Sequence, residues 1–217
     1  MQLRERGLTT EYLHDLLKEM IFGWKLAPGA KININHLARE LNVSPIPLRE
    51  ALSRLQSTNL VVFEPNKGYR VSDILDRESM NQMFEARLLI ESHAVRTVIR
   101  RGDRDIVREL ASLNEKLSRI DTKSSYSEVL AFNQLDHLFH RTLVERCGNP
   151  FLLEAYEGMH CHLHIARFYH LRGEVDQKEA AEEHREIIEA VATRDVYRAE
   201  EAVAGHIREV GKRLLQE

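Results

Sequence analysis

The chain has 217 residues, of which 30% are charged and 43% hydrophobic, and its formal net charge is −3. This length allows two modest domains or one large one, and the composition is ordinary for a soluble globular protein. No apolar run approaches the ~20 residues of a membrane span, the N-terminus lacks the apolar core of a signal peptide, and Cys147 and Cys161 are too few for a disulfide framework. A cytoplasmic protein without membrane contact is therefore expected.

The pattern of the chain changes about a third of the way along it. Residues 1–75 hold ten Lys or Arg and eight Asp or Glu, so this part carries +2 and the remainder carries −5. All but one of the five prolines lie in the first part, whereas long helical periods follow Asp76. This change predicts two domains, 1–75 and 76–217, and is compatible with a DNA-reading half and a half with another task.

The first domain begins with a predicted helix that Thr10 is expected to cap. Its apolar residues recur at i, i+3, i+4, i+7, i+8 and i+11 and form a single stripe: Leu13, Leu16, Leu17, Met20, Ile21 and Trp24. Pro28-Gly29 then ends the helix with a turn. A short second helix is predicted from about Ile34 to Leu41.

A third helix follows after a tight turn. Ser44 is suited to cap it, and Pro45 stands where a missing N–H costs nothing. Two β-prone runs, 60–63 and 69–71, flank a Pro-Asn-Lys-Gly turn and predict a hairpin. Three helices and a hairpin in this order predict a winged helix-turn-helix, in which the second helix of the motif enters the major groove with its N-terminal residues facing base edges.

The second domain is predicted to be an antiparallel bundle of helices, so the fold as a whole is mainly α. One helix is expected from the cap Asp76 to about Arg101, and Arg87 and Glu91 fall on its apolar stripe. Later helices follow, separated by short breaks such as Gly102-Asp103.

Ligand-type side chains lie on the apolar stripes of three later helices. Asp136 and His140 stand one turn apart on the first, His184 on the next, and His206 on the last, which Asp195 opens as a cap. A carboxylate that faces a core is costly unless it is paired. Separate core histidines bonded to carbonyls are the alternative, but four such residues on apolar stripes favour one shared metal site, with two ligands at i, i+4 on one helix.

The residues also carry a family resemblance. The stretch 28–71 is similar to the DNA-binding domain of the GntR family of bacterial regulators, through Pro-Gly after the first helix, Leu-Ala, Val-Ser, Pro-Leu-Arg-Glu-Ala-Leu and the wing glycine. Residues 76–217 resemble the FCD effector-binding domain of the FadR branch, through EARLLIE, LDHLFHRTL with CGNP, EEHREIIEAV and GHI, in its shorter, six-helix, VanR-like form. Pro45 stands where the family commonly has an arginine, so an operator sequence is not carried over.

The resemblance implies a regulator that binds a double-stranded DNA operator. The winged helix in turn predicts a homodimer, because one head reads too few base pairs for specificity. With the whole motif in view, DNA contacts are expected from these residues: Asn35, His36, Arg39, Ser44, Ile46, Pro47, Arg49, Lys67 and Gly68. The alternative for the charged members is an ordinary solvated surface.

In the FCD family an Asp and three His from motifs of this form bind a divalent metal. The matching positions are Asp136, His140, His184 and His206, so one metal per chain is expected, zinc first, with nickel, manganese and iron(II) also accepted. His160, His162 and His164 form a second histidine run without an acidic partner on the same face, and they are interpreted as pocket lining.

A small effector, an organic acid, is expected beside the metal. Arg87 offers a planar positive fork that suits a carboxylate, and Asn133, three residues before Asp136, is expected to line the same cavity. The alternative for Arg87, rated equally, is a buried ion pair with Glu91 one turn away.

Three classes of function fit these features. They are a regulator controlled by an organic effector, a regulator in which the ion itself is the signal, and a metal-dependent hydrolase. The winged helix argues against the hydrolase, and no general base is evident beside the ligands. A metal without cysteine ligands and with room for oxygen ligands favours the effector-controlled regulator, so no enzymatic activity is expected.

Overall fold

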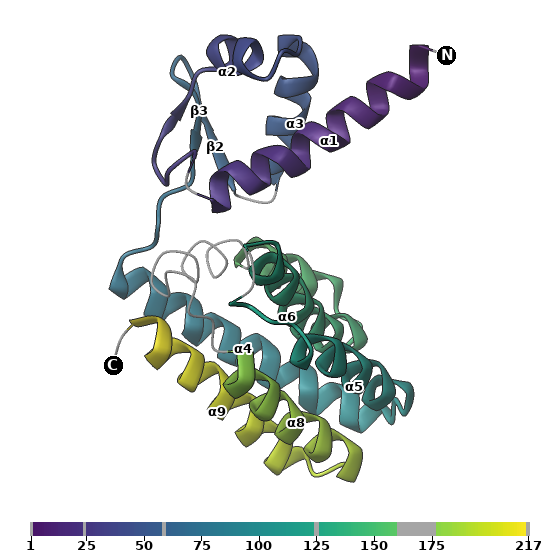
Figure 1. Ribbon diagram of the computed structural model, residues 1–217. Helices are drawn as coiled ribbons and strands as arrows, with labels where there is room; N and C mark the ends of the chain where they lie inside the picture. Colours follow the sequence, from purple (N-terminus) through teal and green to yellow (C-terminus); the bar gives the residue numbers. More distant parts are fainter. Residues whose placement is uncertain (1, 24, 58–59, 124–125, 160–176, 216–217) are drawn as a thin grey trace. The chain divides into compact units, whose positions relative to one another are not determined.

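The computed structural model describes residues 2–23, 25–57, 60–123, 126–159 and 177–215. The chain divides into two compact units, Met1–Ile74 and Leu75–Glu217. The first unit combines three helices with a small sheet, and the described part of the second contains helices only (Figure 1). The predicted fold class, a winged helix-turn-helix followed by a helical bundle, is confirmed. No helix in the described ranges is long and apolar enough to cross a membrane.

The helices of the first unit share one apolar core. α1 (Gln2–Phe22) and α2 (Ile34–Glu40) both pack against α3 (Pro45–Ser57). The α3 residues predicted to face inward are all fully buried: Leu48, Ala51, Leu52 and Leu55. Asn42, with a φ of 53°, adopts the left-handed conformation in the turn between α2 and α3, which asparagine tolerates better than most residues.

The sheet of the first unit has three antiparallel strands in the order β1-β3-β2, where β1 is Lys31–Ile32, β2 Val61–Glu64 and β3 Gly68–Val71. β2 and β3 form the predicted hairpin, and Phe63 pairs with Tyr69 across it. Gly68 has a φ of 87°, a left-handed conformation that glycine adopts without strain. β1 was not predicted, because two residues are too short to show an alternating pattern.

The prediction that Thr10 caps the first helix is wrong. α1 begins at Gln2, and Thr10 lies inside it, 3% exposed. Its hydroxyl donates to a carboxylate oxygen of Glu50 on α3 at 3.3 Å, so it supports the packing of two helices instead of a helix end. The preceding residues include leucine, arginine and glutamate, which are good helix formers and allow the helix to start earlier. Trp24, the last member of the predicted stripe, lies outside the described residues.

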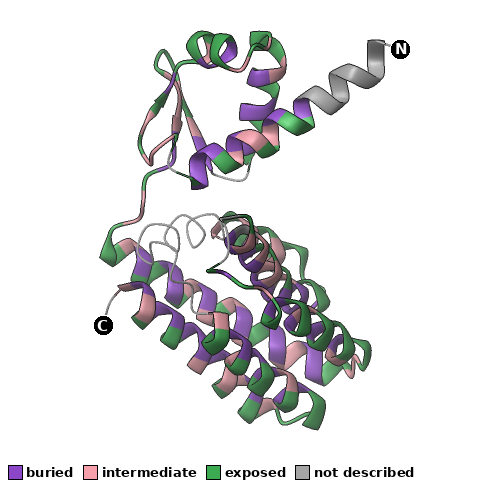
Figure 2. Cartoon of the chain, in the orientation of Figure 1, coloured by how far each residue is buried: buried purple, intermediate pink, exposed green. Residues whose placement is uncertain are grey.

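The second unit holds six helical segments among its described residues. These are α4 (Arg77–Arg101), α5 (Asp105–Ser118), α6 (Tyr126–Arg146), residues 150–159, α8 (Gln177–Thr193) and α9 (Val196–Leu215). α4 packs against α6 and α9, α5 packs against α6 and α8, and α8 packs against α9. Figure 2 shows the buried residues along the inner faces of these helices.

Three helix ends in this unit are formed by the residues that the sequence predicts. Asp76 caps α4 by accepting a hydrogen bond from the amide of Ser79 at 2.8 Å, and Gly102 ends α4 in the left-handed conformation. Asp195 accepts from the amide of Arg198 at 3.0 Å at the start of α9. These caps fix where each helix begins, and therefore which side chains face the core.

Candidate metal centre

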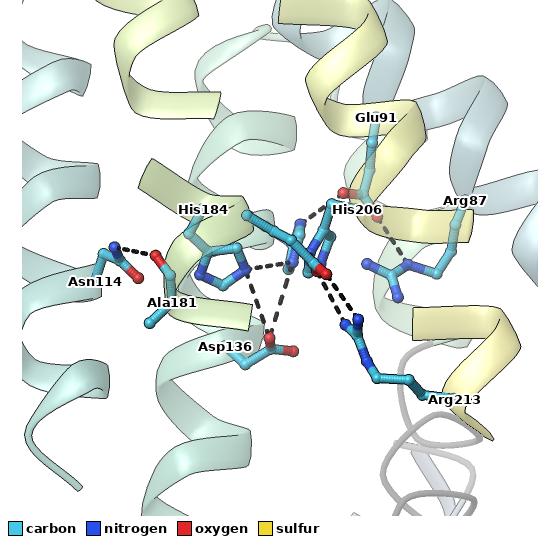
Figure 3. A network of polar contacts seen from close by, with 10 residues as sticks. Arg87, Glu91, Asn114, Asp136, Ala181, His184, His206 and Arg213 are labelled. Atoms are coloured by element: carbon cyan, nitrogen blue, oxygen red, sulfur yellow. Dashed lines mark hydrogen bonds and ion pairs between the residues drawn. The ribbon is translucent and has the colours of Figure 1, made fainter. Parts of the chain in front are cut away.

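Four ligand-type side chains of the second unit converge on one point of its core. Asp136 and His140 come from α6, His184 from α8 and His206 from α9, and each is at most 2% exposed. One ligand atom of each lies within 4.8 Å of those of the others. Figure 3 shows Asp136 and His184 facing one another across this point. The structure therefore brings together the four residues that the apolar stripes singled out.

The distances between the facing atoms suit ligands of a single ion. Nε2 of His184 lies 3.2 Å from Nε2 of His140 and 3.7 Å from Oδ1 of Asp136, and Nε2 of His140 lies 4.0 Å from the same oxygen. Two ligand atoms held ~2.1 Å from one ion at tetrahedral or octahedral angles are about 3.0–3.4 Å apart. The two imidazoles already have this separation, and the carboxylate needs to move by roughly 1 Å or less.

The third histidine supplies a separate indication. Nε2 of His206 is buried, and it has no hydrogen-bond partner among the described residues. Buried polar atoms in proteins are nearly always bonded. A metal ion at the common point would satisfy this nitrogen, so the residues present fit the implied group.

Each histidine ring is held in place from behind. Nδ1 of His140 lies 2.7 Å from a carboxylate oxygen of Glu91, and Nδ1 of His206 lies 2.7 Å from one of Glu183. Ionised carboxylates only accept, so both Nδ1 atoms carry the proton and both Nε2 lone pairs face the centre. The ring of His184 stacks on Phe139, with centroids 3.9 Å apart and planes within 4°.

The two orienting carboxylates are themselves held by arginines. Nε of Arg87 donates to Glu91 at 2.8 Å within α4, and both terminal nitrogens of Arg213 donate to Glu183, at 2.7 and 2.9 Å (Figure 3). Glu91 thereby ties α4 to His140 on α6, and Glu183 ties α8 to His206 on α9. Four helices meet through these contacts.

The electrostatics of the centre favour the protonation states that a metal requires. Burial by itself raises the pKa of Glu91, but Arg87 and His140 outweigh it and lower that pKa to about 2. Burial lowers the pKa of His206 well below its usual value, and His140 adds to the effect. The carboxylate is therefore ionised and the imidazole of His206 neutral, which is the form that binds metal.

Arg87 forms the predicted alternative, a buried ion pair with Glu91, and its two terminal nitrogens stay available. Burial lowers the pKa of Arg87, but the carboxylate of Glu91 outweighs it, so the pKa is raised and the group stays charged. The side chain is 2% exposed, and its two terminal nitrogens have no hydrogen-bond partner among the described residues. Asn133 is fully buried on α6, three residues before Asp136.

Three residues around the centre were missed by sequence reasoning. Glu183 and Arg213 are partly exposed and lie off the predicted stripes, so no periodicity marks them. Tyr156, in the helical residues 150–159, is 1% exposed, and its pKa is raised well above normal by burial and by Glu91. Only the packing of α8 on α9, and of residues 150–159 on the core, brings these side chains to the centre.

The predicted DNA contacts lie on the surface of the first unit. Six of those on α2, just before α3 or in its first turns are exposed: Asn35, His36, Arg39, Ser44, Ile46 and Arg49. Pro47 is half-buried. Lys67 lies in the wing turn, where it pairs with Glu64 at 3.0 Å, and Gly68 is the first residue of β3. Arg49 has no hydrogen-bond or ion-pair partner among the described residues.

The second histidine run, with His160, His162 and His164, lies outside the described residues. Its predicted role as pocket lining is therefore not placed in space.

Comparisons with known proteins give consistent matches for both units. Residues 82–209 match the FCD domain, and residues 9–71 match bacterial regulatory proteins of the gntR family. The HTH-type transcriptional repressor GlaR of Escherichia coli (strain K12) is 30% identical over 196 residues, which cover 88% of this chain and 89% of GlaR. The HTH-type transcriptional regulator YdhC of Bacillus subtilis (strain 168) is 27% identical over 197 residues, covering 89% and 85%. The solved structure of E. coli McbR/YncC has a TM-score of 0.73 at 24% identity, covering 96% of this chain and 97% of that one, and so has the same fold.

Proposed function

The chain belongs to the GntR family of bacterial regulatory proteins and carries an FCD domain, and from this premise we propose that a small carboxylate effector, bound beside a divalent metal, controls its affinity for an operator. The protein is a DNA-binding transcription regulator, and its named relatives are regulators and not enzymes. The metal, the effector and the assembly are what we propose.

The proposed metal ligands are Asp136, His140, His184 and His206. The observation that carries this proposal is the convergence of four buried ligand atoms within 4.8 Å, each from a position that its helix reserves for apolar contact. Three imidazoles and a carboxylate suit zinc, and nickel, manganese and iron(II) accept the same set. When bound, the ion supplies positive charge and open positions for an oxygen ligand.

The proposed effector is an organic acid with its carboxylate on Arg87. The buried guanidinium spends one nitrogen on Glu91 and keeps two, in the planar arrangement that matches a carboxylate. Buried polar and charged groups are costly without partners. A carboxylate would pair with the two remaining guanidinium nitrogens, whereas an uncharged effector would supply no opposite charge to them, so this site favours an acid. Asn133, three residues before the ligand Asp136 on α6, is proposed to contact the effector as well.

A metal-sensing regulator is the second candidate, because it uses the same four ligands. A metal sensor would leave the two terminal nitrogens of Arg87 without a ligand to bind, and these unbonded nitrogens favour the effector-controlled regulator. A hydrolase needs a free general base beside the metal. The two carboxylates behind the histidines are already engaged: Glu91 is bonded to Arg87 and His140, and Glu183 is bonded to His206 and Arg213.

The proposed DNA-reading elements are α3 and the wing, and the proposed assembly is a homodimer. One winged helix reads too few base pairs for high specificity, and two-fold proteins read operators with two related half-sites. The proposed contact residues all lie in the helix-turn-helix or the wing of the first unit: Asn35, His36, Arg39, Ser44, Ile46, Pro47, Arg49, Lys67 and Gly68.

A binding titration tests the proposal. A labelled duplex, selected by the metal-replete protein from a randomised pool, is titrated by fluorescence anisotropy with and without a panel of mono- and dicarboxylic acids. We expect two chains per duplex and a changed Kd with at least one acid, lost after chelation of the metal. A Kd that responds to metal alone, and to no acid, would favour the metal sensor. A protein that selects no duplex would contradict the DNA-reading assignment.

A further inference from the structure

The first turn of α3 presents a large apolar side chain to solvent. Ile46, the second residue of the helix, is 77% exposed. At helical spacing it lies directly opposite the buried stripe of Leu48, Ala51, Leu52 and Leu55, so it points away from the core. The packing of this unit makes no use of its side chain.

The same turn has few hydrogen-bond donors. Prolines occupy the first and third positions of α3, so Pro45 and Pro47 have no N–H to offer. The first four amides of a helix are normally available for contacts with phosphate or bases, and here two of the four are missing. No residue of α3 before Arg49 carries a charged or hydrogen-bonding side chain. The first turn of α3 can therefore contact a partner mainly through apolar side chains.

The face that carries Ile46 is also the face left free for a partner. Arg49, one turn on, lies beside it at i+3, is exposed, and has no partner among the described residues. Glu50, at i+4, also lies beside Ile46, but its carboxylate is already paired with Arg54 at 3.2 Å and accepts from the hydroxyl of Thr10 at 3.3 Å. The unpaired cation and the unpacked isoleucine therefore form one continuous surface.

We propose that Ile46 reads the 5-methyl group of a thymine in the major groove of each operator half-site. This proposal rests on the proposed role of α3 as the reading helix, whose N-terminal residues face base edges. The thymine methyl is the one apolar feature that a base pair presents in the major groove, and aliphatic side chains recognise it by contact. Arg49 then supplies the neighbouring contact to a guanine or a phosphate.

The test separates the methyl group from the rest of the base. The metal-replete full-length protein selects a duplex from a randomised pool, and each thymine is then replaced in turn by deoxyuridine, which pairs identically but lacks the methyl. At one position per half-site, we expect wild-type affinity to fall about fourfold for each methyl removed. Ile46→Ala should bind the thymine duplex correspondingly more weakly and should show no further loss on the deoxyuridine duplex.

A matched control removes another exposed apolar side chain of the same unit. Tyr12, on α1, is 66% exposed, and Tyr12→Ala should keep the full deoxyuridine penalty. A wild-type protein that is indifferent to every replacement, or a penalty that persists unchanged in Ile46→Ala, would overturn the thymine contact while leaving the regulator intact. A wild-type protein that selects no duplex would overturn the DNA-reading assignment and this inference with it.

Discussion

The carboxylate of Glu91 lies 2.7 Å from Nδ1 of His140, so α4 is hydrogen-bonded directly to a proposed metal ligand on α6. α4 begins at Arg77, shortly after the first unit ends at Ile74. A displacement of His140 therefore acts on the helix that follows the DNA-binding unit in the chain. The carboxylates that orient the histidines can therefore be tested by substitution, as the ligands can.

Glu183→Gln should weaken metal binding by about 10–100-fold. The amide can turn its NH2 toward Nδ1 of His206, so the substitution no longer holds that ring with its Nε2 lone pair facing the centre. Competition against a chelator of known affinity measures the change. Glu182→Gln, the exposed neighbour, serves as the matched control and should bind metal like the wild type. Equal affinities in the two variants would show that Glu183 has no orienting role.

Arg87→Lys should abolish the response to a carboxylic acid while metal content and operator binding remain. Lysine keeps a charge beside Glu91 but lacks the planar fork. Arg87→Met should in addition destabilise the second unit by about 3–5 kcal/mol, since it leaves the Glu91 carboxylate buried without its main partner. Anisotropy titrations and urea unfolding separate the two effects. A full acid response in Arg87→Lys would exclude the carboxylate contact.

The stability of the metal-free protein should fall as the pH drops below about 6.5. Burial holds the pKa of His206 well below that of the unfolded chain, so the unfolded state takes up the proton first. The stabilisation is complete above the unfolded pKa and is lost at about 1.4 kcal/mol per pH unit per histidine below it. Urea unfolding between about pH 5.5 and 7.5, a range centred on the usual histidine pKa of ~6.5, measures how the free energy of unfolding changes with pH.

The comparison that isolates this residue uses two histidine variants. His206→Phe should flatten the pH dependence by about one proton, because phenylalanine cannot titrate. His93→Ala removes an exposed histidine of α4 and should leave the slope as in the wild type. If His206→Phe kept the wild-type slope, the buried neutral imidazole would not be the cause.

Arg49→Ala should weaken specific operator binding and leave the fold and the metal content unchanged. Its guanidinium is exposed and unpaired among the described residues, and loss of one good base contact costs about 1–3 kcal/mol. Arg54→Ala is the matched control, since Arg54 is also exposed on α3 but is already paired with Glu50. Both titrations need the same salt concentration, because phosphate contacts make affinity depend on salt. Wild-type affinity in Arg49→Ala would rule out this face of α3 as the reader.

The helical spacing of apolar residues allowed most of the helices and buried ligand residues to be predicted. Residues outside this spacing could not be predicted. A residue such as His184 interrupts an otherwise apolar stripe, so its burial can be read from a single helix. Glu183 and Arg213 lie off the stripes and matter only because α8 packs on α9, which local sequence does not encode. The same limit explains Thr10, whose hydroxyl serves a contact between α1 and α3.

Elemental analysis of the purified protein tests the central claim most directly. The account predicts about one divalent metal per chain in the wild type and in His93→Ala, and almost none in the His184→Ala/His206→Ala double variant. The two substitutions remove ligands from α8 and α9, while Asp136 and His140 remain on α6. Loss of metal from the double variant, with its operator-binding unit still folded, is the predicted result. Full occupancy in that variant would contradict the metal centre described here.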